Sequence, residues 1–98
     1  MAGFEVGQTV HIPCELQPGP FPTEYLVTFE AVEGPVSGFV RAQDVSRNAG
    51  GKAYISALVK EISADTLTVI VKGSFFTTTG LAHLNSGWAN SNVLVAHA

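Results

Sequence analysis

Apolar and polar residues alternate along much of this chain, and this period of two limits its fold more than any other feature. In Val10–Leu16 every second residue is apolar. Because successive side chains of a strand point to opposite faces, the run predicts a half-buried strand with Pro13 on the outward face. Proline cannot donate a ladder hydrogen bond, so we expect this strand to lie at a sheet edge or to bend at Pro13.

Further strands follow from the same pattern. The sequence predicts a hairpin over 25–42 with a tight turn at 33–35, strands at 53–62 and 67–71, and a short strand at 93–95. The apolar run Val69–Val71 predicts burial on both faces, in a barrel or at an interface. Segments 43–51, 73–80 and 85–92 are predicted as loops or turns, the first with room for one helical turn. No segment predicts a long helix.

These elements predict an all-β fold, a small barrel of five to seven antiparallel strands. The chain has 98 residues, which is room for one domain, so residues 1–98 are expected to form a single barrel.

Three pieces of the sequence resemble SH3-type barrels. The segment Gly34–Val45 is similar to the closing part of bacterial SH3-type domains, Gly87–Val95 repeats its cadence, and Val6–Val10 is similar to a first strand. The resemblance implies an SH3-like barrel with one short 3₁₀ turn. It does not imply binding of proline-rich peptides, because the acidic loop and paired aromatics of the eukaryotic family are not present in order. The repeated cadence allows two half-barrels or one elaborated barrel, and we favour one because about 45 residues is little for a separate core.

Composition excludes several classes of protein. Charged residues make up 13% of the chain, against roughly 25% in a typical soluble domain. The net charge is −3 with five Lys and Arg residues in total, which argues against binding to the phosphate backbone of a nucleic acid. One cysteine excludes an intrachain disulfide, and no zinc-binding cluster is recognisable. No apolar run is long enough to span a membrane, and residues 1–5 lack the features of a signal peptide, so we expect a cytoplasmic protein.

Candidate catalytic residues find no partners in the sequence. Cys14 is expected to pack in the core, and His11, His83 and His97 to lie on the surface. Glu30, flanked by apolar residues, is the best candidate for a carboxyl group with a perturbed pKa, although a solvated outward position is the ordinary reading. Without a catalytic motif, we expect no enzyme, no cofactor and no metal.

The loop aromatics are the most informative residues. Phe21 lies between prolines, Phe75 and Phe76 are adjacent and point to opposite sides of an extended chain, and Trp88 follows a glycine in a polar turn. The predicted binding surface consists of Phe21, Tyr25, Phe76, Trp88 and Asn90, with Thr77, Thr78 and Asn92 at its rim. Two alternatives are open: these side chains could cap the ends of the barrel or form an interface between copies of the chain.

Three kinds of function are open to a small barrel with these features. The first is a non-catalytic barrel that self-associates or binds a peptide or protein, which suits the low charge and the mean hydropathy of +0.27. The second is single-stranded nucleic-acid binding by the aromatics, helped by Arg41, Arg47 and Lys52 around one loop. The third is a small-molecule site or enzyme at an oligomer axis, as in the plasmid-borne type II dihydrofolate reductases, whose characteristic segment and lysine-rich pore are absent here. The first is the prediction, with a homo-oligomer and a peptide or protein partner expected.

Overall fold

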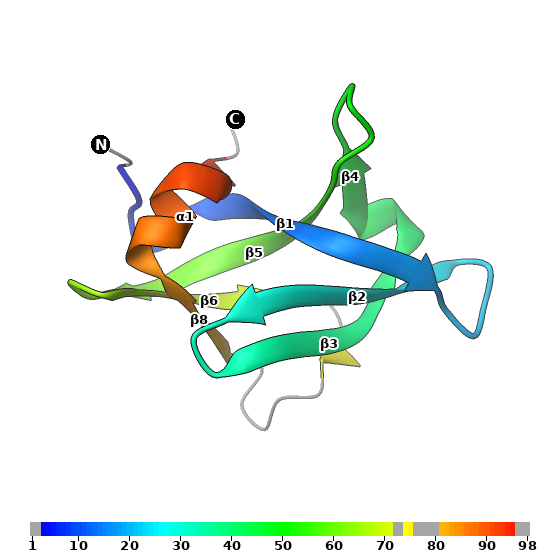
Figure 1. The fold of residues 1–98 in the computed structure, drawn as a ribbon, viewed down its shortest axis with the longest axis horizontal. Helices are drawn as coiled ribbons and strands as arrows, with labels where there is room; N and C mark the ends of the chain where they lie inside the picture. The colour runs from blue at the N-terminus through cyan, green and yellow to red at the C-terminus, as the bar shows by residue number, and fades with distance from the viewer. Residues whose placement is uncertain (1–2, 72–73, 76–80, 96–98) are drawn as a thin grey trace.

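The computed structural model describes residues 3–71, 74–75 and 81–95. Within them the chain forms nine strands, one 3₁₀ turn and one short helix (Figure 1). The elements are β1 (Thr9–Pro18), β2 (Glu24–Ala31), β3 (Gly34–Arg41), the 3₁₀ turn η1 (Ala42–Asp44), β4 (Val45–Arg47), β5 (Ala53–Ile62), β6 (Thr66–Val71), β7 (Ser74–Phe75), β8 (Leu81–Asn85), α1 (Ser86–Asn92) and β9 (Leu94–Val95). The predicted all-β architecture and its 3₁₀ turn are confirmed. Three short strands, β4, β7 and β8, lie in segments that the sequence did not assign to strands.

The strands form one antiparallel sheet that nearly closes into a barrel. Their order is β7-β3-β2-β1-β5-β6-β8, with β4 added to β5 and β9 added to β1. The turn between β2 and β3 reaches β8, where the Val32 N–H donates to the His83 carbonyl oxygen at 2.7 Å. The Glu33 carboxylate accepts from the His83 backbone N–H at 3.0 Å and from Nδ1 of the same residue at 2.8 Å. These three bonds join the last strand of the order to the β2–β3 turn.

The first strand lies inside the sheet, so the expected edge position is wrong. Thr9–Cys14 pairs with β5, and Glu15–Pro18 pairs with β2. On the β2 side, the same strand also pairs with β9 over Val10 and His11. The partner on that side therefore changes near Pro13, which suits the alternative that the strand bends there.

Pro13 occupies a position where its missing N–H costs no ladder bond. The Val59 N–H donates to the Gln8 carbonyl oxygen, so the backbone polar groups of Gln8 point toward β5. This direction alternates along a strand, so the backbone N–H of Cys14 points toward β5 and the backbone nitrogen of Pro13 points away from it. There Pro13 lies between the end of the β9 pairing and the start of the β2 pairing. Its outward register is as predicted, but the residue is buried together with Tyr54, its partner across the ladder.

The core is made of the inward residues of the long strands. It comprises Val10, Ile12, Val27, Phe29, Val36, Val40, Ile55, Ala57, Val59, Leu67, Val69, Val71, Ala82, Leu84, Ala89 and Val93. Val69 and Val71 are buried as expected, but Ile70 between them is 38% exposed. Burial of this run on both faces is therefore not achieved within the chain, because Ile70 points outward beside Leu58, which is 41% exposed.

The β2–β3 hairpin and the β5 strand are confirmed. Pairing runs from Glu24↔Arg41 to Ala31↔Gly34, and the turn itself is Val32–Glu33. Gly34 follows the turn with φ of +114°, a backbone conformation that residues with a Cβ rarely adopt. Glycine at this position therefore lets the second strand leave the turn in register.

A helix stands where the sequence predicted a turn. The Asn85 side chain caps α1 by accepting from the Trp88 N–H at 2.9 Å, and Val93 ends it with a bond to the Ala89 carbonyl oxygen. Ala89 and Val93 are buried in the core, and Trp88 packs against it. Burial of this short apolar face stabilises a segment whose glycine, serine and asparagine residues alone favour a turn. In Figure 1 the helix lies near both chain ends, and the strands it contacts include β6 and β8. Among the described residues, no helix is long and apolar enough to cross a membrane.

Candidate binding site

The loop between β1 and β2 projects from one end of the barrel, at the right of Figure 1. Within it the Gly19 N–H donates to the Glu24 carbonyl oxygen at 3.2 Å, and the Glu24 N–H donates to the Phe21 carbonyl oxygen at 3.1 Å. The Ala42 N–H ties the loop to η1 by donating to the Thr23 carbonyl oxygen at 2.8 Å. Pro18, Pro20 and Pro22 fix their own φ angles. The loop is therefore a rigid one.

Phe21 is the most exposed aromatic side chain of this loop end. It is 63% exposed, although a phenyl ring gains about 1.5–3 kcal/mol when it is fully buried. The loop bonds hold the Phe21 backbone in place, so the backbone does not have to become ordered when a partner contacts the exposed ring.

A cavity of about 550 Å³ lies beside Phe21. Tyr25 from β2 and Arg47 from β4 form part of its wall, and the Arg47 guanidinium carbon lies 5.9 Å from the centre of the Tyr25 ring. This is a cation–π distance, so the two side chains support each other's position. We call the cavity the loop-end site; its lining residues are Leu16, Gln17, Pro18, Gly19, Pro20, Phe21, Pro22, Glu24, Tyr25 and Arg47.

A second cavity adjoins the loop-end site. Its volume is about 500 Å³, and it shares Pro22 and Glu24 with the loop-end site. Arg41 from the end of β3 lines it, together with residues of η1. We call it the Arg41 cavity. The two adjoining cavities thus contain one arginine each.

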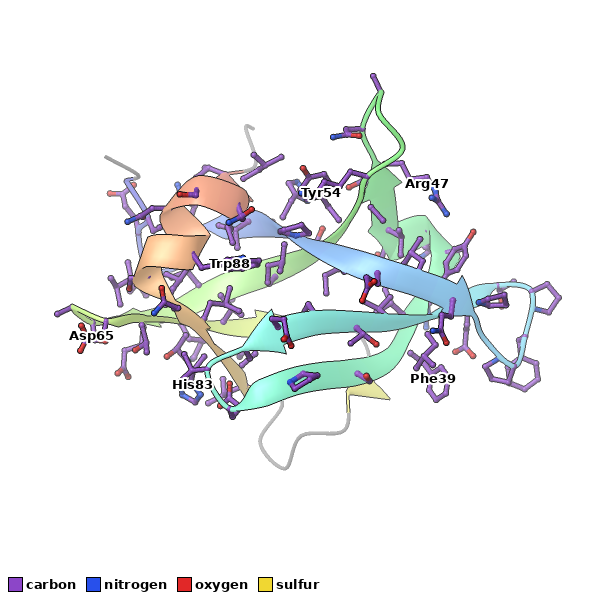
Figure 2. The ribbon with its side chains drawn as sticks, viewed as in Figure 1. Phe39, Arg47, Tyr54, Asp65, His83 and Trp88 are labelled. Carbon is purple, nitrogen blue, oxygen red and sulfur yellow. The ribbon has the colours of Figure 1, made fainter. Side chains whose placement is uncertain are left out.

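The structure brings only part of the predicted aromatic surface together. Phe21 and Tyr25 line the loop-end site. Trp88 lines a separate cavity of about 290 Å³ beneath α1, and Figure 2 shows it well away from Arg47. Asn90 lies at a third position, a cavity of about 190 Å³. Phe76, with its predicted rim residues Thr77 and Thr78, lies outside the described residues. The remaining rim residue, Asn92, lines the same cavity as Trp88.

Arg47 is the site residue that the sequence did not place. The sequence put it in a polar loop near two other basic residues, but β4 pairs with β5 and carries it to Tyr25. The strand has only three residues, so its alternation is too short to be recognised.

Cys14 lines the cavity beneath α1 and packs against the core. Burial raises the pKa of its thiol to about 11, and Arg47 opposes that shift only in part. The thiol is therefore protonated at neutral pH, which suits packing rather than nucleophilic chemistry.

Glu33 is a carboxyl group with a shifted pKa. Desolvation alone would raise the pKa of Glu33, but the hydrogen bonds from the His83 side chain and backbone, with the attraction of His83, outweigh it and lower the pKa. Glu30 is exposed on β2, the ordinary position for a carboxylate. The pair of Glu33 and His83 joins the β2–β3 turn to the middle of β8, and the two residues are far apart in sequence, so no local pattern could have predicted it. In the described part of the chain, no group of three or more His, Cys, Asp or Glu side chains is placed to hold a metal ion.

Comparison of the chain with family models, curated proteins and solved structures finds no match. The resemblance to SH3-type barrels thus rests on the three sequence segments that carry it. Any functional conclusion has to come from the site itself.

Proposed function

We propose that this protein is a non-catalytic cytoplasmic binding module that holds a peptide segment of a partner protein at the loop-end site. The observation that carries the proposal is Phe21, a large apolar ring 63% exposed on a loop held by its own backbone bonds. Exposed aromatic anchors beside a pocket are typical of the residues that contribute most to protein binding.

The surroundings of Phe21 suit a peptide. Proline rings and Tyr25 offer apolar surface, whereas Arg47, Glu24 and the loop carbonyl groups offer hydrogen-bonding partners. A cavity of about 550 Å³ is in the range that holds one or two side chains of a partner. Because the loop is already ordered, binding costs little conformational entropy.

A selection from a library of short random peptides tests the proposal. The wild-type protein is expected to enrich a peptide family that Phe21→Ser no longer binds. Val6→Ser is the matched control, because Val6 is 65% exposed and lies outside the lining of the loop-end site. Equal enrichment by wild type and Phe21→Ser would contradict the proposal.

Self-association is the second candidate, carried by a different observation. Leu58 and Ile70 are neighbours across the β5–β6 ladder, and both are exposed on the outer face of the sheet. A second copy of the chain could bury these two side chains in a symmetric interface. Light scattering across a concentration series tests it: a dimer that Leu58→Ser dissociates would support this candidate, and a monomer at all concentrations would exclude it.

A further inference from the structure

Two arginines line adjoining cavities at the loop end, and Phe21 lines one of these cavities. Arg47 lines the loop-end site together with Phe21, and Arg41 lines the Arg41 cavity. The two cavities share Pro22 and Glu24, so they are neighbours along the loop. The loop end therefore carries an apolar anchor beside one positive charge, with a second positive charge in the adjoining cavity.

Both arginines are exposed. Within the residues that the structure describes, neither forms an ion pair with a carboxylate, although Glu24 is the neighbour of Arg41 across the β2–β3 ladder. The Arg47 guanidinium carbon lies over the Tyr25 ring at 5.9 Å from its centre, and a cation–π contact does not engage the N–H groups as hydrogen-bond donors to an oxygen acceptor. Arginine presents these donors in a planar fork that matches a carboxylate.

Glu24 determines where the negative charges of a partner can lie. It lines both cavities, and it pairs with Arg41 across the β2–β3 ladder. A carboxylate placed next to Glu24 would be repelled, whereas one placed at the outer side of either arginine would be attracted. The chain as a whole carries −3, so any attraction of an acidic partner at this end has to come locally from the two arginines.

We propose that the partner segment is an acidic peptide that combines one apolar residue with two carboxylate side chains. The apolar residue packs on Phe21 in the loop-end site, one carboxylate pairs with Arg47, and the other pairs with Arg41. This inference rests on the proposed function, because it specifies the chemistry of the peptide that the loop-end site binds.

The test uses the peptides that the wild-type protein enriches from the random library. The tightest of them is labelled, and its affinity is measured by fluorescence anisotropy for wild type, Arg47→Gln, Arg41→Gln and the control Lys60→Gln. Lys60 is an exposed cation on β5 that lines neither cavity. We expect enriched peptides that combine an apolar residue with two acidic ones, a loss of about tenfold in affinity for each arginine variant, and no change for Lys60→Gln. Affinity is also expected to fall as salt is added.

The other possible results of this experiment distinguish failure of the acidic-peptide inference from failure of the proposed function. Enriched peptides that lack acidic residues and bind Arg47→Gln as well as wild type would overturn this inference and leave the proposed function standing. Failure of wild type to enrich any peptide over Phe21→Ser would overturn the proposed function itself. A labelled oligothymidylate that binds more tightly than the peptide, and loses affinity in Arg47→Gln, would replace the acidic peptide by a single-stranded nucleic acid.

Discussion

Replacing Gly19 by alanine tests whether the loop is held in the conformation that presents Phe21. A Cβ at Gly19 would lie 2.8 Å from the Glu24 carbonyl oxygen and 3.0 Å from its carbon. Both atoms belong to backbone, so the two segments must move apart. The movement also weakens the bond from the Gly19 N–H to that same oxygen.

The expected magnitude follows from these contacts. Loss of a backbone hydrogen bond costs about 1 kcal/mol, and forcing the segments apart costs about 1 kcal/mol more. Because alanine has less conformational freedom than glycine in the unfolded chain, the substitution also stabilises the folded protein by about 0.5 kcal/mol. We therefore expect Gly19→Ala to lower the free energy of unfolding by about 1.5 kcal/mol, which for a domain of this size lowers Tm by roughly 6–12 °C.

Chemical denaturation and peptide binding are the two measurements. Gly50→Ala is the matched control, because a Cβ there would meet only the Asn48 side chain at an ordinary 3.4 Å. The control should stay within about 0.5 kcal/mol of wild type. Gly19→Ala should also weaken binding of the enriched peptide. If Gly19→Ala were as stable as Gly50→Ala and bound equally well, the rigid-loop argument would be refuted.

Three further predictions concern the barrel. Leu84→Ala should cost about 2–5 kcal/mol in denaturation, because Leu84 is fully buried, whereas Leu94→Ala at an exposed position should cost under about 0.5 kcal/mol; similar losses would contradict the assigned core. Glu33→Gln should destabilise the protein at neutral pH. Because the pKa of Glu33 is lower in the folded state than in the unfolded state, its stabilising contribution is present above the ordinary glutamate pKa and is lost as pH falls through the lowered value. Unfolding curves of wild type and Glu33→Gln should therefore converge in acid, and a pH-independent difference would argue against the His83 contact. The Cys14 thiol, with its pKa raised to about 11, should react slowly with a thiol reagent at pH 8 in the native protein and rapidly in denaturant, and equal rates would place it in solvent.

Local alternation was sufficient to predict most of the long strands. Ala53–Ile62 and the hairpin between β2 and β3 appear where the pattern puts them, because burial alternates along the hairpin strands and along the second half of Ala53–Ile62. The Ser86–Asn92 helix could not be predicted in the same way. It depends on Ala89 and Val93 meeting the core, which is a tertiary contact.

The candidate site was predictable in part. The aromatic residue Phe21 between prolines indicated an exposed anchor, and the structure places Tyr25 in the same cavity wall. The separation of Trp88 from them depends on which end of the barrel α1 covers, and nothing in the local sequence specifies that. The approach of Arg47 to Tyr25 depends on the pairing of a three-residue strand, which has no sequence signal of its own.

The most direct measurement of the central claim is a titration of the isotope-labelled protein with the enriched peptide, followed by the backbone amide signals. The account predicts that the largest shifts occur in Gln17–Tyr25 and at Arg41 and Arg47, and that Phe21→Ser removes them. Shifts centred instead on α1 or on the outer face of β5 and β6, with the loop signals unchanged, would contradict the claim that the loop end binds the partner.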